Sequence, residues 1–202
     1  MPELIAQIRN NLLFERRDEY NCSATPIDWS TRGTPTPIFG SLCILVCLLG
    51  IIPYVACMRI LWELRKQACY KMMFCLGMLD LGVLVGNIFV GVIFIIGGMF
   101  CHSPKIFVAV TFLADGCFVS SCCACLMIAL NRFVELFNIR PLLKIYQGSG
   151  PWGIMTIPLA YGLFFNLFTP FSLSNSEVHV FLFDPMIHDG KYDVSTYFVS
   201  AN

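Results

Sequence analysis

Charged residues are scarce in this chain. Of its 202 residues, 13% are Asp, Glu, Lys or Arg and 57% are hydrophobic. Soluble domains contain about 25% charged and about 45–50% apolar residues, so this composition excludes a soluble globular domain and indicates an integral membrane protein. The formal net charge is zero, and the composition therefore gives no indication of a nucleic-acid partner.

A continuous apolar core is missing from residues 1–36, which excludes a signal peptide there. Water-facing Cys-x-x-Cys pairs are missing as well, and accessible positions hold no grouping of nucleophile, base and metal ligands. The sequence therefore predicts no enzyme, no metal site and no cofactor.

Four long apolar stretches are present, at about 38–62, 72–100, 106–130 and 152–171. Each approaches or exceeds the roughly 20 residues that cross a bilayer as a helix. Helices are expected because lipid offers the backbone no hydrogen-bond partners. The predicted fold is an all-α integral membrane protein with an N-terminal segment (1–36), four transmembrane helices (37–171) and a following loop (172–202).

Lysine and arginine gather in the first and third loops between these stretches: Arg65, Lys66, Lys71, Arg132, Arg140 and Lys144. The positive-inside rule places those loops in the cytoplasm and the N-terminus outside, although four arginines in residues 1–36 oppose this orientation. Asn21-Cys22-Ser23 is a glycosylation sequon, which acts only in the secretory lumen, or else a chance match.

Cysteine is concentrated in the apolar stretches, where it acts as a small apolar residue. Of eleven cysteines, only Cys22 and Cys101 lie in segments expected outside. A disulfide between them would tie the N-terminal segment to the mouth of the bundle in an oxidising compartment.

Asp80 is an acid inside the second stretch. A charge near the bilayer centre costs about 2.5–3.5 kcal/mol on insertion scales, and intramembrane acids are commonly functional. In the functional interpretation Asp80 binds a cation or proton, or couples helix rearrangement, with Asn87 and Ser120 or Ser121 as partners. In the alternative it is a protonated acid bonded to a neighbour. At about 100° per residue, one helical stripe carries Gly77, Asp80, Leu84, Asn87, Gly91 and Gly98.

Asp115 and Arg132 lie 17 residues apart on the third stretch, near opposite faces of the membrane. Asp115 lines a ligand pocket open to the outside, or it pairs across helices as a packing acid. Arg132 is an interfacial residue that reaches lipid phosphates, or a switch that opens toward a cytoplasmic partner.

These motifs together resemble the nematode serpentine chemoreceptors of class T, the Srt group of seven-helix receptors. The resemblance covers about residues 20–200 and is carried by Tyr20-Asn21-Cys22-Ser23, Ser41 to Tyr54, Cys69-Tyr70-Lys71-Met72-Met73, Gly77-Met78-Leu79-Asp80, Cys101-His102-Ser103-Pro104, Asn131-Arg132-Phe133-Val134-Glu135, Phe183-Asp184-Pro185 and Tyr192.

The resemblance implies a rhodopsin-like seven-helix bundle that senses a small molecule and signals through a heterotrimeric G protein, in the plasma membrane of sensory cells. It further implies that Asp80 matches an acid found at sodium sites, that Ser121 is its partner, and that Arg132 matches the third-helix arginine. The chain departs from the pattern at Asn131, where an acid is usual, and in lacking a cysteine in the loop after the fourth stretch.

Residues 172–202 would hold that loop and the start of a fifth helix, so the chain is expected to be part of a longer receptor. Two alternatives stay open. One is a four-span structural or scaffolding membrane protein, and the other is a truncated receptor product that does not signal.

Overall fold

The computed structural model describes residues 33–169, 172–176 and 180–182. Within these residues, four helical segments are long and apolar enough to cross a membrane. Three are the single helices α2 (Pro37–Glu63), α3 (Ala68–Ile96) and α4 (Pro104–Leu136). The fourth consists of α6 (Gly150–Ile154) and α7 (Thr156–Phe168). The predicted all-α membrane fold is confirmed.

The helix bounds follow local chemistry as well as hydropathy. The stretch predicted at 72–100 is helical only to Ile96, because Gly97 adopts the left-handed conformation (φ 67°) that closes α3. The stretch predicted at 106–130 continues as α4 to Leu136, and Arg132, Glu135 and Leu136 in this extension are good helix formers. Near the fourth stretch a turn at Met155 separates α6 from α7.

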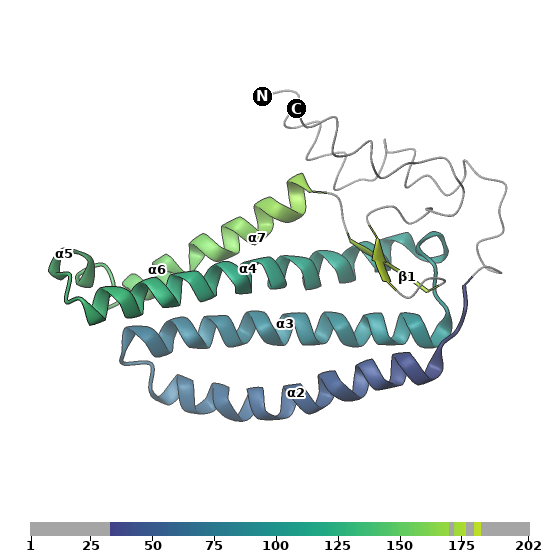
Figure 1. Cartoon of the computed structure of the whole chain (residues 1–202), viewed down its shortest axis with the longest axis horizontal. Helices are drawn as coiled ribbons and strands as arrows, with labels where there is room; N and C mark the ends of the chain where they lie inside the picture. The colour runs from purple at the N-terminus through teal and green to yellow at the C-terminus, as the bar shows by residue number, and fades with distance from the viewer. Residues whose placement is uncertain (1–32, 170–171, 177–179, 183–202) are drawn as a thin grey trace, which may run out of the picture.

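Among the described helices, the membrane-spanning segments pack side by side in chain order (Figure 1). α3 lies beside α2, α4 beside α3, and α7 beside α4, while the short α6 also contacts α3. α3 therefore has protein on two sides. On one side, a Cβ added to Gly91 would lie 3.0 Å from the carbonyl oxygen of Gly40 in α2. On the other, a Cβ added to Gly86 would lie 2.6 Å from the Cβ of Ala114 in α4. Small residues thus allow close helix approach on both faces.

The two ends of the bundle differ. We call one the hairpin end; it holds residues 33–36, the 3₁₀ helix η2 (Phe100–His102) and the antiparallel strands β1 (Leu173–Asn175) and β2 (Val180–Leu182). We call the other the basic end; it holds the α2–α3 turn, the end of α4 and the short helix α5 (Arg140–Leu143). The two strands lie where the sequence predicted only a loop, and they pair Leu173 with Leu182.

Backbone hydrogen bonds fasten the hairpin end. Gly98 N donates to the carbonyl of Ile93 (2.8 Å), and Gly97 N donates to the carbonyl of Phe94 (3.4 Å), the pattern that caps a helix with a left-handed glycine. The segment entering α2 is tied to the same place, since Thr36 N donates to the Phe94 carbonyl at 2.8 Å. Thr34 Oγ1 donates to the carbonyl of Ser176 (2.7 Å), which joins the segment after β1 to the same cluster.

Candidate functional site

Asp80 joins three helices. From α2, Tyr54 Oη donates to Asp80 Oδ2 at 2.9 Å. From α4, Ser121 Oγ donates to Asp80 Oδ1 at 2.5 Å. Both carboxylate oxygens therefore have a hydroxyl donor, and the acid is satisfied by hydrogen bonds within the helical region. We call these three residues the Asp80 cluster.

Neighbouring serines of α4 serve different interfaces. Ser121 faces Asp80, whereas Ser120, turned by about 100° on the helix, is 3% exposed and faces α7. A Cβ added to Gly162 of α7 would lie 2.0 Å from Ser120 Oγ, so α7 sits directly on this part of α4. Of the two serines considered as partners of Asp80, the structure brings Ser121 to it.

Asn87 does not join the Asp80 cluster. It lies on the same stripe of α3 as Asp80 but seven residues further on, about 10 Å along the axis. Its Nδ2 donates to the Val83 carbonyl at 3.0 Å within the same helix. The distance along the helix keeps it from reaching Asp80 and brings it to a second site.

Asn87 and Asp115 line one pocket of about 340 Å³ near the hairpin end, which we call the Asp115 pocket. Ser172, just before β1, donates its hydroxyl to Asp115 Oδ2 at 2.6 Å. The remaining lining is mostly apolar: Val83, Val90, Thr111, Ala114 and Phe118. A pocket with apolar walls and a few convergent polar groups is the usual form of a small-molecule site.

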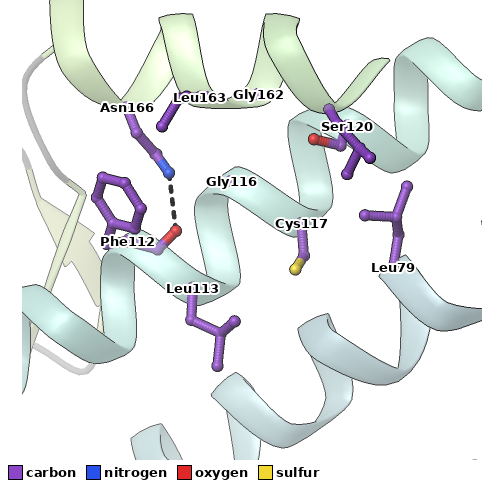
Figure 2. A pocket seen from close by; sticks show the side chains of 10 residues that line it. Leu79, Phe112, Leu113, Gly116, Cys117, Ser120, Gly162, Leu163 and Asn166 are labelled. Carbon is purple, nitrogen blue, oxygen red and sulfur yellow. Dashed lines mark hydrogen bonds between the residues drawn. The ribbon is translucent and has the colours of Figure 1, made fainter. Parts of the chain in front are cut away.

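The α4–α7 interface is also partly polar. Asn166, 3% exposed on α7, donates Nδ2 to the Phe112 carbonyl of α4 at 2.8 Å, as Figure 2 shows. The surrounding pocket of about 180 Å³ is bordered by α3, α4 and α7, and Leu79, Leu113 and Cys117 line it. This contact holds α7 against α4 and so supports one wall of the helix group around Asp80.

Arg132 lies at the basic end of α4, where its side chain is 57% exposed. Its Nη1 is 3.3 Å from Oε2 of Glu135, one turn further on. Asn131 is fully buried, and its Nδ2 donates to Glu135 Oε1 at 3.2 Å. The carboxylate that position 131 lacks is thus supplied by Glu135, which both Asn131 and Arg132 contact.

Cys101 is disulfide-bonded. The nine other cysteines of the described residues are free. Cys22, its predicted partner, and the sequon residue Asn21 lie outside the described residues, so the pairing and the glycosylation stay predictions.

The sequence analysis did not predict that Tyr54 would contact Asp80, or that Glu135 would contact Asn131 and Arg132. Tyr54 lies ten residues from the start of the α2–α3 turn and Asp80 thirteen residues past its end, so both have similar depth in antiparallel helices. This similar depth could have predicted the contact between Tyr54 and Asp80 from the sequence. Glu135 follows Arg132 by three residues, which is the spacing of neighbours on one helix face.

The fold and the Asp80 cluster define a polytopic helical membrane protein in which α2, α3 and α4 are joined through an acid inside a membrane-spanning helix. The family model described as "Serpentine type 7TM GPCR chemoreceptor Srt" matches residues 7–201. The chain belongs to this family of seven-helix membrane chemoreceptors, a receptor family and not an enzyme family. No curated protein and no solved structure matches the chain.

Proposed function

We propose that the chain acts in chemosensory signalling, binding an external small molecule in the Asp115 pocket and passing the signal on by helix rearrangement. A heterotrimeric G protein would respond at the basic end. The N-terminus and the hairpin end would face the outside, in the plasma membrane of sensory cells. The excess of Lys and Arg at the basic end supports this orientation.

One observation carries the proposal: the Asp115 pocket and the Asp80 cluster share the same two helices. Asn87 and Asp80 both belong to α3, and Asp115 and Ser121 both belong to α4. Asp115 precedes Ser121 by six residues, about 9 Å along α4. A ligand that shifts α3 against α4 at the pocket therefore changes the geometry of the Asp80–Ser121 hydrogen bond.

The pocket's chemistry restricts the ligand. The Asp115 carboxylate accepts hydrogen bonds from the side chain and the backbone of Ser172, and a carboxylate in this pocket favours a ligand group that donates a hydrogen bond or carries positive charge. The apolar walls favour a compact hydrocarbon body. Asp80 and Arg132 remain the proposed switch residues, with Asp80 also the candidate cation site.

The test is a cellular reporter of G-protein activation in cells that express the chain, exposed to a panel of small amines, alcohols and acids. For an active compound, Asp115→Asn should lower potency by about tenfold to a hundredfold, because it removes a charge-assisted hydrogen bond. Lys105→Gln is the control, since Lys105 is exposed near the hairpin end and does not line the pocket. Equal potency in both variants and the unaltered chain would contradict the pocket assignment.

A further inference from the structure

A groove distinct from the two pockets described above lies between α2 and α3, close to the basic end. It has a volume of about 430 Å³ and is lined by Val55, Met58, Arg59, Trp62, Phe74, Met78 and Leu81. We call it the α2–α3 groove. The surface that it exposes is apolar throughout, so Arg59 lines it with the hydrocarbon part of its side chain. Arg59 and Trp62 both stand toward the end of α2 at the basic end.

On α3, the groove lies on a different face from Asp80. On α3, Phe74, Met78 and Leu81 are turned from Asp80 by about 100–160° at 100° per residue. α4, which brings Ser121 to the Asp80 side of α3, therefore does not cover this face. Trp62 is 46% exposed and Met78 is 54% exposed, so within the described residues this apolar surface is open to the surroundings of the bundle.

The rim of the groove at the basic end is aromatic and cationic. Trp62 packs on Phe74 with ring centroids 5.0 Å apart, and Phe74 contacts Trp152 of α6 at 6.3 Å. The guanidinium of Arg65 stacks over the Trp62 ring, 4.1 Å from its centroid, and donates to the Trp62 carbonyl at 2.7 Å. Tryptophan and arginine at a helix end are typical of the level of lipid headgroups.

Arg59 is the charged residue of the groove lining. Within the part of the chain that the structure describes, it forms no ion pair, since the ion pair there joins Arg132 to Glu135. Arg65 and Lys66 add two positive charges just beyond the rim. An occupant with an apolar tail and a negative head would match the apolar groove and the positive charges at its basic end.

We propose that the α2–α3 groove binds one anionic phospholipid from the membrane leaflet at the basic end. An acyl chain lies along Val55, Met78 and Leu81, and the phosphate faces Arg59 beside the Trp62–Arg65 stack. Basic pockets between transmembrane helices bind anionic headgroups by the same combination of charge and apolar contact. The proposal goes beyond chemosensory signalling and does not depend on it.

Quenching of Trp62 by brominated lipid tests the proposal. The full chain, with Trp29→Phe and Trp152→Phe so that Trp62 is its sole tryptophan, is placed in phosphatidylcholine vesicles. A low fraction of the lipid is brominated on its acyl chain. The brominated lipid is phosphatidylglycerol in one set of vesicles and phosphatidylcholine in the other. Brominated phosphatidylglycerol should quench the fluorescence of Trp62 at least twofold more strongly than brominated phosphatidylcholine. Arg59→Gln should abolish that difference, and Arg59→Lys should largely restore it.

Arg140→Gln is the matched control, because Arg140 is an exposed arginine of the basic end outside the groove lining. It should leave the preference for phosphatidylglycerol intact, with helix content in circular dichroism unchanged in all variants. Equal quenching by the two lipids would overturn the proposal. Equal loss of preference in Arg59→Gln and Arg140→Gln would also overturn it, since attraction would then be a property of the whole charged end.

Discussion

At the scale of single residues, the Asp80 cluster shows how an acid is accommodated in a membrane helix. Asp80 has two acceptor oxygens, and Tyr54 and Ser121 approach them from the helices on either side. Removing one donor leaves an acceptor without a partner where water is scarce. The three side chains therefore depend on one another, and each helix contributes one of them.

Replacing Tyr54 with Phe should destabilise the bundle, because the ring is kept while the hydrogen bond to Asp80 is lost. We expect the free energy of unfolding to fall by about 1 kcal/mol, within the range measured for such bonds in membrane proteins. Thermal unfolding in detergent measures the change. Tyr161→Phe is the control, since Tyr161 is 51% exposed on α7 and forms no hydrogen bond within the described residues. A loss no larger than the control's would contradict the role given to Tyr54.

At the scale of elements, the ends of the helices depend on particular backbone conformations. Gly97 ends α3 with a φ of 67°, and a Cβ there would lie 2.8 Å from the backbone nitrogen of Pro35. Gly148, between α5 and α6, has a φ of 60° but nothing within 4 Å of such a Cβ. The two positions share a conformation and differ in their surroundings.

Gly97→Ala and Gly148→Ala separate these two effects. Each substitution should lower the free energy of unfolding by about 1–2 kcal/mol, because it places an L-residue in the left-handed region. Gly97→Ala should lose roughly a further 1–3 kcal/mol, because its methyl group presses on the segment entering α2. Thermal midpoints of the two variants give the difference. Equal midpoints would show that the contact with Pro35 does not restrain the hairpin end.

Hydropathy predicted the existence of these elements well, and it predicted less about how they face each other. The stretch at 72–100 reads as apolar through Phe100, yet the conformation of Gly97 ends α3. Equally, the stripe through Asp80 and Gly91 indicated one packed face of α3, whereas Gly86 packs a second face against α4. Helical periodicity shows which small or polar residues share a face of a helix. Which neighbouring helix that face contacts depends on side-chain packing that a single sequence does not contain.

At the scale of the whole molecule, the two ends carry different chemistry. The described part of the basic end holds Arg65, Lys66, Lys71, Arg132, Arg140 and Lys144, and Lys71 donates a hydrogen bond to the carbonyl of Gly148 there. The hairpin end is held by backbone hydrogen bonds and contains the disulfide-bonded Cys101. This contrast is what a fixed orientation in the membrane requires.

Glycosylation of Asn21 reports that orientation directly. The chain expressed in eukaryotic cells should migrate faster on a gel after treatment with a glycosidase that removes N-linked glycans. Asn21→Gln and Ser23→Ala should each abolish the shift, since both destroy the sequon. Unchanged migration of the treated, unaltered chain would contradict the proposed external N-terminus.

The packing of the described membrane-spanning segments in chain order also bears on biosynthesis. α2 and α3 are joined by a four-residue turn at one end and by the Thr36–Phe94 backbone bond at the other, so the pair is closed once residue 98 has left the ribosome. α4 packs on this pair next and brings Ser121 to Asp80, and α7 packs on α4. Contacts between neighbours in sequence form quickly. We therefore expect the described helices to assemble in chain order as they enter the membrane, with the Asp80 cluster complete once α4 is in place.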